Sequence, residues 1–145
     1  MAQAFGEDVK QFIDRELDLK EVINAAREIQ GWTVQEAAVA ERRYRDFLWA
    51  CWNVVNNKVP DIGSLSRFAA FSRSVDDVWH EHILWTEKYR EDCARVFDGR
   101  FLDHVPVYAA KVNESDIKKA EKVYLLLNLG VPPDTIHECV WAIVG

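Results

Sequence analysis

The 145-residue chain has the usual length of one domain and is too short for two domains that each have a core of their own. Apolar residues make up 49% of it and charged residues 29%, a balance that is typical of a folded globular protein and argues against disorder. The net charge of −6 argues against nucleic-acid binding, because neutralising phosphates requires an excess of Lys and Arg. No apolar run approaches the length of a membrane span.

The cysteines and the first residues bear on the cellular compartment. Cys51, Cys93 and Cys139 are odd in number, which argues against a disulfide framework. The start Met1–Phe5 lacks the basic residues and the apolar core of a signal peptide. We therefore expect a cytoplasmic protein that does not associate with membranes. Six Trp, seven Phe and four Tyr are enough to build its core without a disulfide or a metal.

The first third of the chain has apolar residues at helical spacing, with a break predicted near Leu17–Leu19. Gly31 ends this segment as a C-terminal helix cap would. The apolar positions are Val9, Phe12, Ile13, Leu17, Val22, Ile23, Ala26 and Ile29.

A long helix is predicted over Thr33–Val55. Thr33 and Glu36 match a capping box, in which the Thr hydroxyl accepts the amide of the third helical residue and the Glu side chain reaches back. Trp49 and Trp52 widen the apolar face of this helix. We therefore expect it to be the central helix of the fold.

The rest of the chain also favours helices. A short helix is expected over Ser64–Phe71, a helix capped by Ser74, another that begins at Thr86, a helix over Asn113–Leu129, and a last short helix from Asp134 or Thr135 through Ile143. Phe101–Asn113 is expected to be extended, and no segment shows a convincing strand alternation. The sequence thus predicts one all-α domain over residues 1–145, a bundle of five to seven helices.

Residues suited to chemistry are concentrated in Ser74–Tyr108, the motif region. Three of the four histidines and one cysteine lie here within 25 residues. Imidazole and thiolate are the ligands that a Zn-type ion prefers, and carboxylates can complete its coordination. The candidate metal ligands are Asp76, His80, His82, Cys93 and His104.

Helical geometry limits which of these candidates can meet. Asp76 and His80 are four residues apart, so they share a face and are expected side by side. A helix turns about 100° per residue, so His80 and His82 are expected to point in nearly opposite directions. The chain after Phe97 must return across the two helices, so we expect His104 and Cys93 to approach Asp76 and His80 more closely than His82 does.

Three interpretations of the motif region remain open, and spacing alone favours them in this order. The first is polar packing, in which Asp76 accepts a hydrogen bond from His80 while aromatic residues pack the helices. The second is metal binding. The third is nucleophilic catalysis by Cys93 with His104 as the base. His80-Glu81-His82 does not match His-Glu-x-x-His, and no complete catalytic signature is present.

Over about 35 residues the motif region has a distinctive set of positions: Val75, Asp76, Trp79, His80, His82, Ile83, Leu84, Thr86, Tyr89, Asp92, Cys93, Phe97, Gly99, His104 and Pro106. These positions resemble the motif region of glycine-rich domain-containing protein-like sequences, which occur in plants and in small bacterial and phage-borne proteins. The resemblance implies that Trp79 and Tyr89 belong to one site together with the five candidate ligands. It does not imply a particular reaction.

Two functions are compatible with these features. The first is a small non-catalytic binding protein, accessory or inhibitory, that docks an acidic or aromatic helical face on a protein partner. An exposed apolar patch that contains Trp85 or Trp32 would favour it. The alternative is a Zn-type metal-dependent hydrolase that uses the region around His80, Cys93 and His104.

Overall fold

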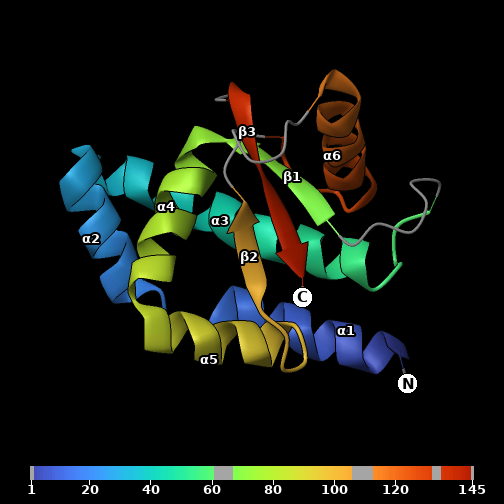
Figure 1. Cartoon of the computed structure of the whole chain (residues 1–145). Helices are drawn as coiled ribbons and strands as arrows, with labels where there is room; N and C mark the ends of the chain where they lie inside the picture. Colours follow the sequence, from blue (N-terminus) through green and yellow to red (C-terminus); the bar gives the residue numbers. More distant parts are fainter. Residues whose placement is uncertain (1, 61–66, 106–112, 132–134, 145) are drawn as a thin grey trace.

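The computed structural model describes residues 2–60, 67–105, 113–131 and 135–144. In these ranges the fold is mainly helical and carries one small sheet (Figure 1). The elements in chain order are α1 (Ala2–Gln11), the π-helix η1 (Phe12–Glu16), α2 (Lys20–Gln30), α3 (Val34–Val55), β1 (Arg67–Ser72), α4 (Arg73–Leu84), α5 (Thr86–Val96), β2 (Leu102–Val105), α6 (Glu114–Leu126) and β3 (Thr135–Val144).

The central helix is α3, as predicted. It runs through the middle of the molecule and packs against α2, α4, α6, η1 and β1 (Figure 1). Thr33 forms the predicted capping box with Glu36, and both hydrogen bonds of the box are present. In its second half the helix is buried on nearly all sides, because Tyr44, Phe47, Leu48, Ala50, Cys51, Trp52 and Val54 all face neighbouring elements.

The N-terminal helices also follow the prediction. The predicted break near Leu17–Leu19 is present, because η1 ends at Glu16 and α2 begins at Lys20. Gly31 caps α2 in the left-handed conformation, with φ of 70°, and its amide donates to the Arg27 carbonyl. A residue with a Cβ would be strained at this φ, which explains why glycine ends the helix.

The expectation of an all-α fold needs correction. Strands β1, β3 and β2 form an antiparallel three-stranded sheet in that order. β3 takes the place of the predicted last helix, and β1 takes the place of the described part of the predicted helix Ser64–Phe71. β-branched residues are frequent in β3 and favour a strand, but Ile136, Val140 and Ile143 are also spaced as on a helix.

The α4–α5 hairpin and the returning strand position the motif region. The Ser72 hydroxyl, rather than that of Ser74, accepts the Val75 amide as the N-cap of α4. α5 starts at Thr86 as predicted, and the chain reverses through Asp98 and Gly99, both of which have positive φ. β2 then runs back along the hairpin within the predicted extended segment. None of the described helices is long and apolar enough to cross a membrane.

Candidate functional site

Six of the seven motif residues form one connected cluster between α4, α5 and β2. The exception is His80, which is exposed on α4 while His82 is buried. The predicted opposition of these two histidines is thus confirmed. The members of the motif cluster are Asp76, Trp79, His82, Tyr89, Cys93 and His104.

One end of the cluster is a carboxylate–imidazole pair. The His104 Nε2 atom lies 2.7 Å from Asp76 Oδ1, which confirms the expected approach of His104 to Asp76. The centroid of the His104 ring is 4.4 Å from that of Trp79. Both side chains of the pair are partly exposed, at 19% for His104 and 33% for Asp76, so this end faces solvent.

The middle of the cluster is a buried pair of aromatic residues, Trp79 and Tyr89, whose hydrogen bonds connect β2 to the helices. Trp79 donates its indole N–H to the Tyr89 hydroxyl over 2.8 Å, and this hydroxyl donates in turn to the Leu102 carbonyl. Burial raises the pKa of Tyr89 far above its ordinary value, so the hydroxyl keeps the proton that it donates. The Trp79 indole N–H and the Tyr89 hydroxyl therefore both have hydrogen-bond partners inside the protein.

The other end is centred on His82, which is 1% exposed. Its Nδ1 lies 2.6 Å from the Tyr44 hydroxyl, and its Nε2 lies 2.8 Å from Asp92 Oδ2. Burial lowers the pKa of His82, although the Asp92 carboxylate acts in the opposite direction, so the ring is neutral at pH 7. An ionised carboxylate only accepts hydrogen bonds, so Nε2 carries the proton and Nδ1 accepts from Tyr44.

Asp92 supplies the negative charge of this end. Burial acts to raise its pKa, but hydrogen bonds from His82 and Lys88 lower it below the ordinary value. The Lys88 ammonium lies 2.9 Å from Asp92 Oδ2, one helical turn away on α5. Asp92 is thus ionised and paired with a cation on its outer side.

Cys93 is a poor candidate for a nucleophile. It is 3% exposed, and burial raises the pKa of its thiol to about 11, although hydrogen bonds with the Leu102 backbone and Tyr89 act in the opposite direction. Only a thiolate attacks or binds a metal well, and this thiol stays protonated at neutral pH. Cys51 and Cys93 are both free and buried. The Cys139 side chain lies outside the described residues.

The five predicted metal ligands do not meet at one point. Asp76 bonds to His104, His82 bonds to Tyr44 and Asp92, and His80 is exposed. In the described ranges no group of three or more His, Cys, Asp or Glu side chains is placed to hold a metal ion. The geometry therefore favours polar packing over the other two interpretations, but it corrects the expected pair, because the hydrogen-bond partner of Asp76 is His104 rather than His80.

The two hydrogen-bond partners of His82, Tyr44 and Asp92, are not among the predicted site residues. Asp92 stands next to Cys93 in the motif, ten residues after His82. Tyr44 is on the buried face of α3, where its hydroxyl needs a partner, and this need is the signal that could have identified it. Nothing in the spacing indicates that the partner is His82, 38 residues away.

Acidification should destabilise the protein through His82. Its pKa is lowered in the folded state, so the unfolded chain binds the extra proton and stability is lost as the pH falls below about 6.5, the ordinary value. We expect the free energy of unfolding in urea to fall between pH 7.5 and pH 5. In the variant His82→Gln, whose amide can donate to Asp92 and accept from Tyr44, the fall should be smaller. Equal falls in the two proteins would contradict the neutral, buried state of His82.

Comparison with known proteins places this hairpin within a larger family unit. The model of the UCP032817-like family matches residues 18–127, which include α2 to α6, and the chain therefore belongs to this family. No curated protein and no solved structure matches the chain. The resemblance to glycine-rich domain-containing protein-like sequences stays a prediction.

Proposed function

We propose that this member of the UCP032817-like family is a small non-catalytic binding protein, accessory or inhibitory, that docks a basic segment of a partner protein. The docking surface is the α4–α5 corner, which we define as Leu84, Trp85, Glu87 and Glu91. One observation carries the proposal: Leu84 is 60% exposed and Trp85, the next residue, is 37% exposed. An exposed patch that contains Trp85 is the feature expected of a binding protein.

The chemistry of the corner favours a positively charged partner. A shallow hollow is lined by Trp85, Glu87, Lys88 and Glu91, and both carboxylates are exposed. The Lys88 ammonium is directed to Asp92 at 2.9 Å, so it offsets a different carboxylate. An Arg or Lys of the partner could place its cation over the Trp85 ring and beside these carboxylates.

The corner is held in a fixed shape. The Trp85 indole N–H lies 3.3 Å from Glu81 Oε1, which restrains the ring from the side of α4. Below it, the motif cluster links the two helices through the His82–Asp92 and Trp79–Tyr89 hydrogen bonds. A surface that is ordered before binding loses less entropy on docking. In this proposal the motif residues support the binding surface and do not contact the partner.

Co-purification with the tagged chain from its own cells, followed by calorimetry with the recovered protein, tests the proposal. Trp is enriched among interface residues whose removal costs about 2 kcal/mol or more, so Trp85→Ala should weaken binding roughly 30-fold. Glu87→Lys should weaken it as well, through repulsion of the basic segment. Leu125→Ala is the matched control, because Leu125 is a 67% exposed apolar residue on α6.

Three outcomes would count against the proposal. One is that no stable partner is recovered. Another is that Trp85→Ala and Glu87→Lys bind as tightly as the original chain. The third is that Leu125→Ala weakens binding as much as Trp85→Ala does, which would place the interface elsewhere.

A further inference from the structure

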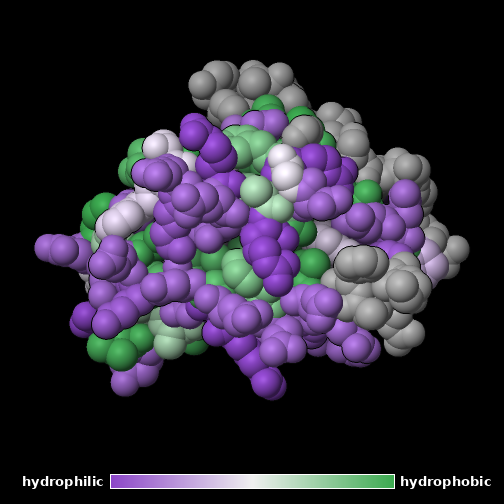
Figure 2. Space-filling model, turned by 90° about the horizontal axis from the view of Figure 1, so that it is seen from below, coloured by the Kyte–Doolittle hydropathy of each residue, from purple (hydrophilic) through white to green (hydrophobic). Residues whose placement is uncertain are grey.

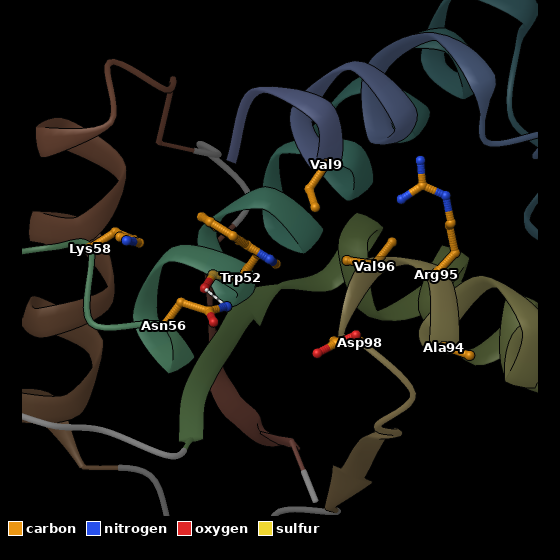
Figure 3. Close-up of a pocket in the computed structure, with 8 residues that line it drawn as sticks. All are labelled: Val9, Trp52, Asn56, Lys58, Ala94, Arg95, Val96 and Asp98. Atoms are coloured by element: carbon orange, nitrogen blue, oxygen red, sulfur yellow. Dashed lines mark hydrogen bonds between the residues drawn. The ribbon is translucent and has the colours of Figure 1, made fainter. Parts of the chain in front are cut away.

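A cavity of about 570 Å³ lies at the other end of α5, between this helix, α1 and the end of α3 (Figure 3). This volume is within the range of sites that hold small molecules. The cavity involves no member of the motif cluster and none of the α4–α5 corner. Figure 2 views the molecule from the side of α1 and α5, and hydrophobic surface is visible near the middle of that face, surrounded by hydrophilic side chains.

The inner wall of the cavity is apolar and firmly placed. Val9, Trp52 and Val96 line it, and each is at most 9% exposed. The Trp52 ring stacks on that of Trp49, with the centroids 5.3 Å apart and the planes within 5°. The indole is therefore held in one orientation, and its edge and face can pack against an apolar or aromatic ligand.

The charged lining residues have an excess of positive charge. Lys58 and Arg95 line the cavity together with one carboxylate, Asp98. In Figure 3 the two cations lie on either side of Trp52 and Val9, and Asp98 lies below them. The Arg95 guanidinium is 4.7 Å from the centroid of the Phe12 ring, which holds it near α1. Such an excess stands out in a chain whose net charge is −6.

We propose that this cavity binds a small aromatic or aliphatic anion, such as an organic carboxylate or sulfonate. The apolar part of the ligand packs on Trp52 between Val9 and Val96, and its anionic group reaches Lys58 or Arg95. Apolar walls with a few polar groups that fix orientation are characteristic of small-molecule sites. The site is independent of partner docking at the α4–α5 corner.

A pair of fluorescent probes with the same rings tests the proposal. 1-Anilinonaphthalene-8-sulfonate carries a sulfonate, and N-phenyl-1-naphthylamine is its neutral counterpart. We expect one molecule of the sulfonate to bind per chain, roughly tenfold or more tightly than the neutral probe. The reason is that charge-assisted hydrogen bonds are stronger than neutral ones. The double variant Lys58→Gln with Arg95→Gln should remove most of this preference and leave the affinity of the neutral probe within about twofold.

The control is the double variant Arg90→Gln with Lys119→Gln, which removes two exposed cations from α5 and α6 outside the cavity. It should leave both affinities unchanged. In ¹H–¹⁵N spectra the indole N–H signal of Trp52, assigned with Trp52→Phe, should shift on binding, whereas that of Trp85 should not. The proposal is overturned if neither probe shows saturable one-to-one binding or if the two probes bind with equal affinity. It is also overturned if the control variant loses the preference for the sulfonate as fully as the Lys58→Gln with Arg95→Gln variant does.

Discussion

Replacing Trp79 by Ala should lower the free energy of unfolding by about 3–5 kcal/mol, as large aromatic truncations in cores do. Trp79 is fully buried, and its ring centroid lies 5.0 Å from that of Phe47 on α3 and 4.4 Å from that of His104 on β2. Its removal would leave a cavity at the junction of three elements. The Tyr89 hydroxyl would also lose its indole donor. Guanidinium unfolding followed by circular dichroism measures the loss.

Two companion variants make this result interpretable. Trp79→Phe keeps a ring but removes the indole N–H, so it should cost less than Trp79→Ala. Trp85→Ala removes a partly exposed Trp from the same hairpin and should cost less than about 1 kcal/mol, as surface substitutions do. Equal losses for Trp79→Ala and Trp85→Ala would mean that the hairpin is not packed through Trp79.

Trp52→Ala is the second substitution with a large expected effect, again about 3–5 kcal/mol of unfolding free energy. Trp52 is 8% exposed on the central helix and stacks on Trp49. At the ring edge α1 approaches so closely that a Cβ at Gly6 would lie 3.2 Å from the Trp52 ring. Truncation would therefore loosen the contact of α1 with α3.

The same unfolding measurement on Val39→Ala gives the control for Trp52. Val39 is on the same helix but is 47% exposed, so its truncation should cost less than about 1 kcal/mol. A loss below about 1 kcal/mol for Trp52→Ala would show that the indole is not part of the core and that the central position of α3 is misassigned.

The sequence could predict the features that depend on nearby residues. The capping box of Thr33 with Glu36 and the glycine cap at Gly31 involve contacts within a few positions, so their residue types identify them directly. The opposition of His80 and His82 follows from helical rotation alone. Which of the two is buried depends on Tyr44 and Asp92, and spacing within the motif does not contain that information.

The sheet could not be predicted in the same way. β1 and β3 pair over a long sequence separation, for example Phe68 with Ala142, and no local pattern specifies such a register. The prediction of a metal site likewise rests on residue types and not on the hydrogen-bond partners of those residues. Once Tyr44, Asp92 and the Leu102 carbonyl are brought near the motif, most of its polar atoms bond to the protein itself.

The central proposal is that the motif cluster stabilises the α4–α5 hairpin and that the exposed α4–α5 corner binds a partner protein. Calorimetric affinities of the co-purified partner for Trp85→Ala and His80→Ala test it most directly, because both residues lie on the hairpin and neither is buried. We predict that Trp85→Ala weakens binding roughly 30-fold and that His80→Ala leaves it within about twofold. Loss of binding with His80→Ala and normal binding with Trp85→Ala would contradict this proposal, because the partner would then contact the histidine of the motif region and not the α4–α5 corner.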